Sequence, residues 1–311
     1  MKRIETENLT KKFGDITAVE NLTLGVEEGE VFGFLGPNGA GKTTTVRMLC
    51  CLISKTGGEA NICGYDIGRG GDCLNIRKVI GLLSENVGLY EELTAYRNLD
   101  FYAKMYDCPE GKRRENIEHF LKLLGLWDRR DRPVGTFSKG MKQKIAIARA
   151  LIHDPQVLFL DEPTANLDPE SAKTVRDFIL ELKKERRTIF VNTHNLDEAE
   201  RICDRIGILR TRLVAVGSPK DLRESLWGRK TVVHMEVATE EAVNAVRSLG
   251  VKNLEVSGNK LVIDLEDPEK ENPGIINAIV GAGGHIQFVT ELRPTLEDVY
   301  LKLVKGGRQA S

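Results

Sequence analysis

The chain has 311 residues, of which 41% are hydrophobic and 29% are charged. This composition is typical of a soluble globular protein with about two domains, and it excludes an intrinsically disordered chain. The 45 basic and 46 acidic residues leave a formal net charge of −1 at pH 7. Nucleic acid is therefore not an expected partner, because proteins that bind it usually carry a basic excess.

The cysteines and the apolar runs indicate the cellular compartment. The six cysteines contain no CxxC spacing and have no histidine at the distance of a zinc-ligand motif, so reduced thiols are favoured over a zinc site. No apolar run approaches the roughly 18 residues that a membrane-spanning helix needs. The opening residues, MKRIETENLT, are too polar for a signal peptide. We therefore expect the chain to stay in the cytoplasm.

A glycine-rich segment, GPNGAGKTTT, occupies residues 36–45. An apolar run precedes it at residues 31–35, and a helical pattern begins near Lys42, so the order is strand, turn and helix. Glycine costs backbone entropy inside either element and proline removes a donor, so the segment is a loop that needs a bare backbone. In this context the spacing G-x-x-x-x-G-K-[ST] predicts a phosphate-binding loop, against the alternative of a glycine loop formed by chance.

The parts of this loop have separate expected roles. The inward backbone N–H groups are expected to cradle phosphate oxygens, helped by the positive end of the helix dipole. Lys42 is expected to place its ammonium on the β- and γ-phosphates, and the Thr43 hydroxyl to join the shell of a Mg²⁺ ion. The residues of the loop expected to bind nucleotide are Gly36, Pro37, Asn38, Gly39, Ala40, Gly41, Lys42, Thr43 and Thr44.

A second apolar run, VLFLDEP, occupies residues 157–163 and contains two acids near its end. Such a run predicts the buried central strand of a parallel sheet. Adjacent strand residues point to opposite faces, so Asp161 and Glu162 should have different roles. Asp161 is expected to hold the Mg²⁺ shell, and Glu162 to deprotonate the attacking water, a role worth about 10²–10⁴-fold in rate. The alternative is a pair of acids that ends a strand at the surface.

Taken together, these segments resemble the ATP-binding cassette (ABC) ATPases over about residues 2–225. GPNGAGKT resembles the Walker A motif of that family, and VLFLDEP resembles its Walker B motif. FSKGMKQK, residues 137–144, resembles the ABC signature through Ser138 and Gly140. ANLD, which ends at Asp168, resembles the D-loop.

Two further single residues match the family in position. His194, in VNTHNLDEA, resembles the switch histidine and could donate a hydrogen bond to the γ-phosphate. Phe13, in KKFGDITAV, resembles the aromatic residue that stacks on adenine. Without the resemblance, a lone phenylalanine is more often part of a core, and a lone histidine after a strand is more often a turn residue. The resemblance assigns catalytic roles to Lys42, Glu162 and His194, and ATP contacts to Phe13 and Asp168.

The resemblance also implies a fold and an assembly. The fold would be an α/β P-loop domain at residues 1–225, with a mixed sheet and a helical subdomain at about residues 88–150. ATP and Mg²⁺ would be the nucleotide and metal. In the family, the residues matching Ser138 and Gly140 bind the γ-phosphate of ATP held by a second subunit, which implies a head-to-tail dimer. A homodimer is the simpler expectation.

The sequence departs from the family pattern at three positions. Glu85 stands where most members have a glutamine that contacts the Mg²⁺ ion and the attacking water, and we expect it in the nucleotide and metal site. An ionised carboxylate there cannot donate a hydrogen bond, which would change Mg²⁺ dependence or slow turnover. In the signature, Lys139 replaces the first glycine and Met141 replaces the usual glutamine. Lys139 either adds charge near a phosphate or points to solvent.

The C-terminal part, residues 228–311, has a different pattern of elements. The order is a strand, a helix, a hairpin turning at residues 257–259, a second helix and a last strand, which suggests a small α+β ferredoxin-like domain. Asn272 is expected to cap the second helix, with Pro273 as its first residue. The closing segment RPTLEDVYLKLV, capped by Thr295, resembles the C-terminal end of exporter ATPases of the daunorubicin-resistance and sodium-export type.

The leading interpretation is the ATPase subunit of an ABC exporter, located on the inner face of the cell membrane and coupled to a separate transmembrane permease. The loop with Val87, Leu89 and Tyr90 would dock that permease, or would be a local hydrophobic anchor. Two alternatives remain. One is a soluble ABC protein that acts on ribosomes or nucleic acid, and the other is an ATP-gated regulatory protein whose C-terminal domain senses a ligand.

Overall fold

The computed structural model describes residues 1–84, 87–227, 229–292 and 295–306. The chain forms two compact units, Met1–Ser218 and Pro219–Ser311. The boundary expected after residue 225 lies inside a helix of the second unit, α8 (Pro219–Trp227). None of the helices in these parts is both long and apolar enough to cross a membrane.

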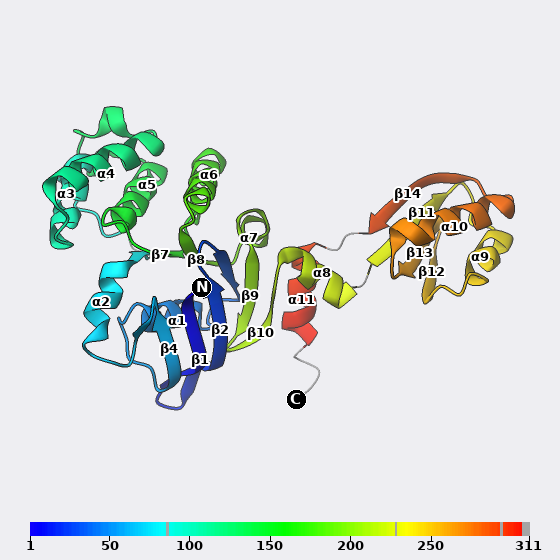
Figure 1. Ribbon diagram of the computed structural model, residues 1–311. Coiled ribbons are helices and arrows are strands. Elements are labelled where there is room, and N and C mark those ends of the chain that lie inside the picture. Colours follow the sequence, from blue (N-terminus) through cyan, green and yellow to red (C-terminus); the bar gives the residue numbers. More distant parts are fainter. Residues whose placement is uncertain (85–86, 228, 293–294, 307–311) are drawn as a thin grey trace. The chain divides into compact units, whose positions relative to one another are not determined.

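A six-stranded sheet is the centre of the first unit (Figure 1). Its order is β10-β9-β3-β8-β7-β6, and all neighbours are parallel except the antiparallel edge strand β10. The strands are β3 (Val31–Leu35), β6 (Ile80–Leu83), β7 (Val157–Asp161), β8 (Thr188–Thr193), β9 (Arg205–Arg210) and β10 (Arg212–Gly217). Every residue of β3, β7 and β8 is buried, as expected for central strands covered on both faces.

Four phenylalanines form the aromatic part of the core beneath this sheet. The ring of Phe190 on β8 lies 5.3–5.5 Å from those of Phe32 and Phe34 on β3 and of Phe159 on β7. Pairs of this kind stabilise a fold by about 0.5–1.5 kcal/mol beyond their buried area. The packing holds β3, β7 and β8 together, and the functional residues follow the carboxyl ends of these three strands.

A smaller antiparallel sheet, in the order β2-β1-β4-β5, packs with the same core. Its strands are β1 (Lys2–Phe13), β2 (Ile16–Glu27), β4 (Gly57–Ile62) and β5 (Tyr65–Asp66). Strands β1 and β2 form a hairpin that turns through Gly14, whose φ of 56° lies in the left-handed region open to glycine. Phe13 therefore stands at the hairpin tip, where half of its surface is exposed.

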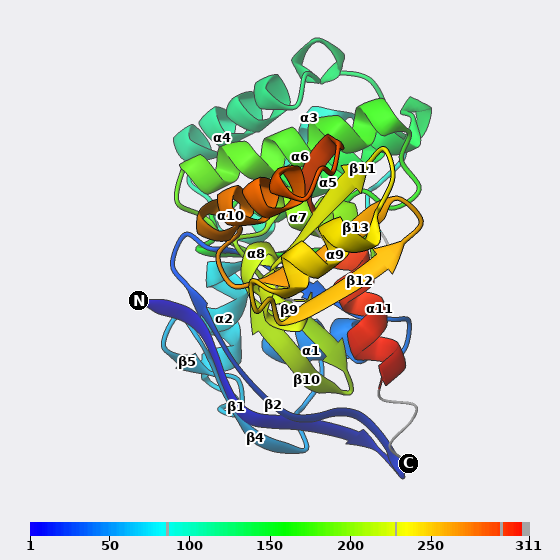
Figure 2. The same cartoon turned by 90° about the vertical axis from the view of Figure 1, so that its right-hand side faces the viewer.

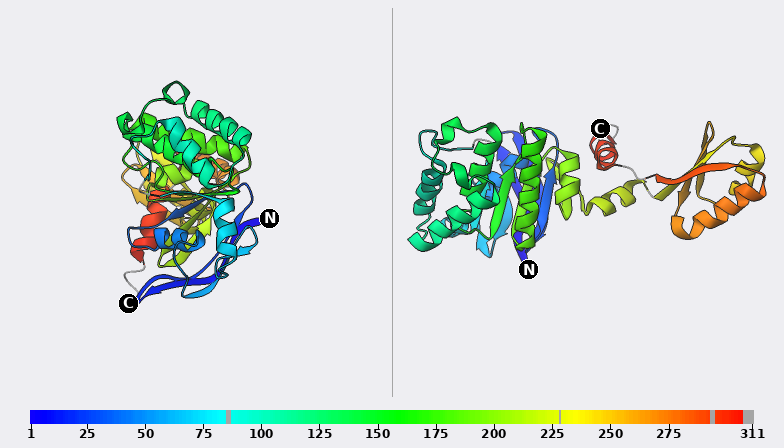
Figure 3. Two further views of the ribbon diagram at one scale, coloured as in Figure 1. Left: turned by 90° about the vertical axis from the view of Figure 1, so that its left-hand side faces the viewer. Right: turned by 90° about the horizontal axis from the view of Figure 1, so that it is seen from above.

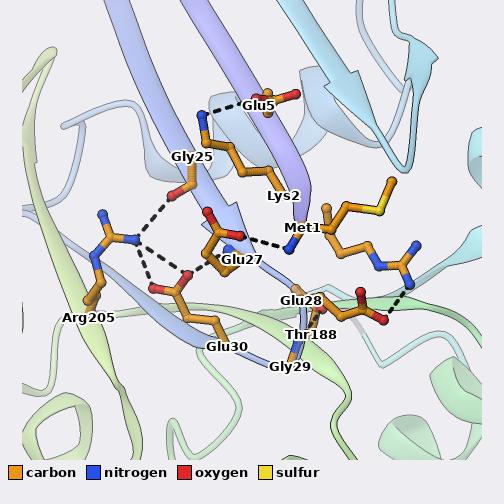
Figure 4. A network of polar contacts seen from close by, with 11 residues as sticks. Met1, Lys2, Glu5, Gly25, Glu27, Glu28, Gly29, Glu30, Thr188 and Arg205 are labelled. Atoms are coloured by element: carbon orange, nitrogen blue, oxygen red, sulfur yellow. Dashed lines mark hydrogen bonds and ion pairs between the residues drawn. The ribbon is translucent and has the colours of Figure 1, made fainter.

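A buried polar network fixes the turn between β2 and β3 (Figure 4). The Glu30 carboxylate, only 8% exposed, accepts hydrogen bonds from the Glu27 backbone N–H at 2.7 Å and from the Arg205 guanidinium at 3.1 Å. The Gly29 backbone N–H donates to the Thr188 hydroxyl at 3.0 Å. These hydrogen bonds connect the start of β3 to both of its neighbours, β9 and β8. The glycine-rich loop therefore follows a strand that is held in place at its other end.

Helices complete the first unit, and three of them gather at one end of it (Figures 1 and 3). These three are α3 (Ala95–Met105), α4 (Glu110–Leu123) and α5 (Lys139–Leu151). The others are α1 (Lys42–Leu49), α2 (Asp72–Val79), α6 (Pro169–Lys184) and α7 (Leu196–Ile202), with 3₁₀ turns at Trp127–Arg129 and Val134–Thr136. The fully buried Asn98 of α3 bonds the backbone of Tyr90 in both directions, at 2.9 Å each, and so anchors the loop before α3.

The second unit contains a four-stranded antiparallel sheet in the order β12-β13-β11-β14 (Figure 1), of which Figure 2 labels β12, β13 and β11. Its elements in chain order are β11 (Arg229–Met235), α9 (Glu240–Arg247), β12 (Asn253–Ser257), β13 (Lys260–Leu265), α10 (Pro268–Gly281) and β14 (Ile286–Leu292). Both helices pack on one face through a core that includes Val233, Val246, Ile263 and Ile279. This order and pairing form the ferredoxin-like arrangement that the sequence predicts.

The predicted start of α10 is wrong. The helix begins at Pro268, and Asn272 and Pro273 lie inside it. Pro268 already occupies the first helical position, which suits its fixed φ and missing N–H. The Glu271 carboxylate accepts from the backbone N–H groups of Glu266 and Asp267, at 2.9 and 2.6 Å, and this pairing fixes the earlier start.

The last helix, α11 (Leu296–Gly306), packs on α8. The Thr295 hydroxyl accepts from the Asp298 backbone N–H at 3.2 Å, and the Asp298 carboxylate accepts from the Thr295 backbone N–H at 2.9 Å. Reciprocal bonds of this kind satisfy two donors at a helix start. The predicted cap at Thr295 is confirmed.

Candidate nucleotide-binding and hydrolysis site

The glycine-rich loop joins β3 to α1 in a conformation that only small residues allow. Gly41 has a φ of 102°, and a Cβ atom there would lie 2.3 Å from the Ala18 carbonyl oxygen of β2. A Cβ on Gly36 would lie 2.4 Å from the Leu209 carbonyl oxygen. Gly39 has open space around it but a φ of 81°. Backbone contacts thus require glycine at two positions, and backbone conformation favours it at the third.

We expect Gly41→Ala to weaken ATP binding at least tenfold, because the loop must shift to relieve a contact with a backbone oxygen. The measurement is the ATP dissociation constant by isothermal titration calorimetry, beside the melting temperature. Gly250→Ala is the matched control, since Gly250 also has a positive φ of 75° but no atom near its Cβ position. The control introduces strain of about 1–2 kcal/mol without the clash. Equal ATP affinity in both variants would contradict the expectation.

Lys42 begins α1 and is 92% buried, with 8% of its surface exposed. Its ammonium donates to the carbonyl oxygens of Gly36 and Pro37, at 2.6 and 3.2 Å, so it lies within its own loop. Burial lowers the pKa of Lys42, and the negative charges of Glu162 and Asp161 partly oppose that effect. A cation held among carbonyl oxygens at the N-terminus of α1 is suited to a polyphosphate.

The loop forms one wall of a cavity of about 600 Å³. The residues of the site that line the cavity include Lys42, Thr43, Gln143, Asp161, Glu162 and His194. The structure therefore brings together the two acids, the lysine and the histidine that the sequence singled out. Gln143, whose side chain donates to the Pro163 carbonyl oxygen at 2.9 Å, was not anticipated.

Asp161 ends β7 and is oriented by two partners. The Thr43 hydroxyl donates to one carboxylate oxygen at 3.2 Å, and the Asn192 side-chain amide donates to the other at 3.2 Å. Asn192 is fully buried and lies opposite Asp161 in the parallel pairing of β7 and β8. Its signal in the sequence was an asparagine that closes the apolar run TIFVN beside the acid-tipped strand.

The donors around Asp161 fit a magnesium ion. Mg²⁺ prefers oxygen ligands and is usually held by one or two carboxylates together with substrate phosphates. Asp161 and the Thr43 hydroxyl supply hard oxygen donors beside the phosphate loop. The described residues contain no group of three or more His, Cys, Asp or Glu able to hold a metal by themselves. A metal here would therefore depend on the nucleotide and on water for the rest of its ligands.

Glu162 follows Asp161 with an unusual backbone, since its φ is 49°. Such a conformation costs a non-glycine residue about 1–3 kcal/mol and is retained where the surroundings impose it. The Glu162 backbone N–H donates to the Asn192 carbonyl oxygen at 2.9 Å. Its carboxylate lies 2.7 Å from His194 Nδ1, and the His194 side chain is 65% exposed. The turn thus aims Glu162 at His194, away from the partners of Asp161.

A buried acid, Glu198, lies behind Glu162. Only 2% of Glu198 is exposed, and burial raises the pKa of its carboxyl group. The hydroxyls of Thr164 and Thr193 lie 2.8 and 3.1 Å from its two carboxylate oxygens. Sequence reasoning missed this residue, because only the fold brings Thr164 and Glu198 into contact.

The segments that resemble the signature and D-loop meet at the N-termini of α5 and α6. Ser138 caps α5 by accepting from the Met141 backbone N–H at 3.3 Å, and Asp168 caps α6 by accepting from that of Ser171 at 2.9 Å. Hydrogen bonding to Ser171 is the main reason that the pKa of Asp168 is lowered. A Cβ on Gly140 would lie 2.3 Å from the Ser171 hydroxyl oxygen, so the two helix starts are in close contact.

The remaining expected site residues lie elsewhere. Among the described residues, Phe13, Gly36, Ser138, Gly140 and Asp168 do not line the cavity. Phe13 is half exposed, with the Lys11 ammonium 4.8 Å from its ring centre. The two residues that depart from the signature pattern, Lys139 and Met141, both lie in the first turn of α5. Lys139 is exposed, and the Met141 sulfur accepts a hydrogen bond from the Arg129 guanidinium at 3.4 Å. Glu85 lies outside the described residues.

Two protein-family models match the chain. The model described as ABC transporter matches residues 19–165, and that of the DrrA1-3-like ATP-binding protein C-terminal domain matches residues 217–304. The linearmycin resistance ATP-binding protein LnrL of Bacillus subtilis is 34% identical, with 96% of this chain and 97% of that protein covered. The bacitracin transport ATP-binding protein BcrA of Bacillus licheniformis is 35% identical, with 98% of each covered. The daunorubicin resistance ATP-binding protein DrrA3 of Streptomyces coeruleorubidus is 33% identical, with 98% and 97% covered.

Solved structures of ATP-binding cassettes are similar to this chain. An ATP-binding subunit of an ABC transporter has a TM-score of 0.66 and 31% identity, and the match covers 72% of this chain and 93% of that one. A dimeric post-hydrolysis structure of the cassette MJ0796 bound to ADP and Pi has a TM-score of 0.62 and 28% identity. That match covers 69% of this chain and 98% of the other.

Proposed function

The chain belongs to the ATP-binding cassette (ABC) transporter ATPases, and on that premise we propose that it drives export through a separate membrane subunit by hydrolysing ATP at Glu162. The observation that carries the proposal is the convergence of Lys42, Asp161, Glu162 and His194 on one cavity beside the glycine-rich loop. Lys42 binds the phosphates, and Asp161 with Thr43 holds Mg²⁺, which neutralises phosphate charge when bound.

Glu162 is the general base in this proposal. Its carboxylate takes the proton of the attacking water, and His194 orients it through Nδ1, 2.7 Å away. With both ring nitrogens protonated, the Nε2–H of His194 donates to the γ-phosphate. The strained turn at Glu162 supports this role, because such strain persists where it places a functional group. Phe13 stacks on the base in this proposal, as the family pattern implies, whereas the role of Glu85 stays an expectation from the sequence because that residue lies outside the described ranges.

We further propose a head-to-tail homodimer. Ser138 and Gly140, at the N-terminus of α5, and Asp168, at that of α6, would face the nucleotide of the partner subunit. Helix N-termini attract anions, and the two helix starts are held together by the contact of Gly140 with Ser171. The related cassette MJ0796 is dimeric in the structure that holds ADP and Pi.

The proposed direction and location come from the relatives. Proteins named for linearmycin resistance, bacitracin transport and daunorubicin resistance match this chain over nearly their full length. These names speak of resistance and transport, which supports export from the inner face of the cell membrane as the function proposed for this chain. The docking surface for the membrane subunit would include Tyr90 and Phe101, which are 46% and 39% exposed with ring centres 5.1 Å apart.

Co-purification from gently solubilised membranes tests the proposal. We expect a multi-span membrane protein, identified by mass spectrometry, to accompany the tagged chain. It should also accompany the control Phe288→Ala, which changes a 67% exposed aromatic of the second unit. The double variant Tyr90→Ala/Phe101→Ala should lose the partner while still binding ATP. Ribosomal proteins or nucleic acid in place of a membrane protein would overturn the transport role.

A further inference from the structure

The hydroxyl group of Thr193 stands between two carboxylates. It lies 3.1 Å from a carboxylate oxygen of Glu198 and 3.4 Å from one of Glu162. Its oxygen also accepts from the Asn195 backbone N–H at 3.0 Å. A hydroxyl has one proton to donate, so Thr193 can serve only one of the two acids at a time. The shorter distance favours Glu198.

The other contacts of Glu198 keep it in place beneath the site. The Thr164 hydroxyl, in the loop between Glu162 and α6, donates to its second oxygen at 2.8 Å. Asn195 caps α7, and its side-chain oxygen accepts a hydrogen bond from the Glu198 backbone N–H at 3.0 Å. Glu198 is therefore bonded to three segments: the loop after β7, the end of β8 and the start of α7.

We propose that Glu198 is a positioning residue for ATP hydrolysis, which decides through the Thr193 hydroxyl how strongly Glu162 is hydrogen-bonded. The inference rests on the proposed role of Glu162 as the base. When Glu198 is ionised, it holds the Thr193 proton, and Glu162 keeps a free lone pair for the attacking water. When Glu198 is protonated, it donates to the Thr193 oxygen, and the Thr193 proton turns to Glu162. A base that already accepts a hydrogen bond binds a proton less readily.

The surroundings of Glu198 raise the pH at which its carboxyl group takes up a proton. Burial raises the pKa of Glu198 above that of an ordinary glutamate, and the charge of Glu162 raises it further, whereas the two threonine hydroxyls and Arg176 of α6 lower it. The Cys203 thiol at the end of α7 also faces Glu198, and burial raises the pKa of that thiol so that it stays neutral. As pH falls, Glu198 therefore gains its proton earlier than an exposed glutamate would, and turnover falls with it.

Glu198→Gln is the central variant, because its amide mimics the protonated acid and donates to Thr193 at every pH. We expect kcat at pH 7.5 to fall about three- to tenfold with an unchanged KM for ATP, since general-base efficiency follows basicity. The acidic limb of the kcat profile should move to lower pH, because glutamine does not titrate and the variant no longer takes up the Glu198 proton as pH falls. Thr193→Val removes the shared hydroxyl, and adding Glu198→Gln to it should change kcat less than twofold.

The outcomes separate positioning from a purely structural role. An equal effect of Glu198→Gln with and without the Thr193 hydroxyl, or a lowered melting temperature with unchanged kcat and pH profile, would overturn the inference. Should Thr193→Val fail to fold, the shift of the acidic limb in Glu198→Gln alone decides the question. The role of Glu162 is tested independently by Glu162→Gln. If that variant is inactive while the Glu198 variants behave as the unmodified chain, only the positioning role is rejected.

Discussion

Glu162→Gln is expected to lower ATP turnover at least a hundredfold while ATP still binds. A general base is worth about 10²–10⁴-fold in rate, and an amide cannot take the proton of the attacking water. Glutamine has the same shape as glutamate, so it can keep the positions 2.7 Å from His194 and 3.4 Å from Thr193. Phosphate release at saturating ATP measures the loss, and calorimetry measures the binding that remains.

The same variant also reports on assembly. If ATP closes the dimer and hydrolysis loosens it, the variant should accumulate as an ATP-bound dimer in gel filtration. Glu255→Gln is the control, because Glu255 is an exposed glutamate on β12 of the second unit. It should match the unmodified chain in turnover and in size. Turnover of Glu162→Gln within tenfold of the unmodified chain would reject Glu162 as the base.

Lys42→Ala is expected to raise the dissociation constant for ATP at least about thirtyfold. Removing one partner of a buried, hydrogen-bonded charge pair costs about 2–5 kcal/mol, and each 1.4 kcal/mol is a factor of ten in the dissociation constant. Lys42 is 8% exposed and is held in place by the Gly36 and Pro37 carbonyl oxygens. The remaining attraction for phosphate would come from the backbone N–H groups and the dipole of α1.

Lys55→Ala is a matched control for Lys42→Ala. The Lys55 ammonium also donates to a backbone carbonyl oxygen, that of Gly58, but it lies outside the cavity. Both variants therefore lose a lysine that binds the backbone, and only one of them loses a phosphate contact. Calorimetry with ATP and a thermal melt of each variant separate lost affinity from lost folding. Retention of ATP affinity in Lys42→Ala would exclude the lysine from the phosphate site.

Much of the fold could be predicted because its signals are local. The buried run of β3 is followed by a glycine-rich loop with Lys42, and the buried run of β7 ends at Asp161, followed by Glu162. These residue types by themselves indicate phosphate binding in the first case and metal binding and base catalysis in the second. The order of elements in the second unit could be predicted from its alternating strands, its amphipathic helices and the turn at residues 257–259. The predicted start of α10 was wrong, because Pro273 was chosen where Pro268 already supplied a first helical residue.

The rest of the site depends on contacts between distant segments. Asn192 holds Asp161 only because β8 lies beside β7 in this register. In the sequence, Glu198 is one of two acids in the first turn of a helix and has no distinguishing pattern. Its burial depends on the packing of α7 against the end of β8, which the sequence does not show. Glu85 stays a prediction. Local patterns in the sequence therefore locate the residues that contact substrate, whereas the residues that hold them in position can be found only from the fold.

The closeness of Gly140 to Ser171 has an evolutionary consequence. Any side chain at residue 140 would meet the Ser171 hydroxyl oxygen within the same subunit, with no nucleotide involved. Selection for folding alone would therefore keep glycine at this position, and its retention among relatives would not by itself reveal a ligand. Glycine at position 171 should accompany any natural replacement of Gly140, because a Cβ at residue 140 would also lie 2.7 Å from the Ser171 Cβ. Covariation between these two positions would thus record the packing of two helices, separately from the chemistry of ATP.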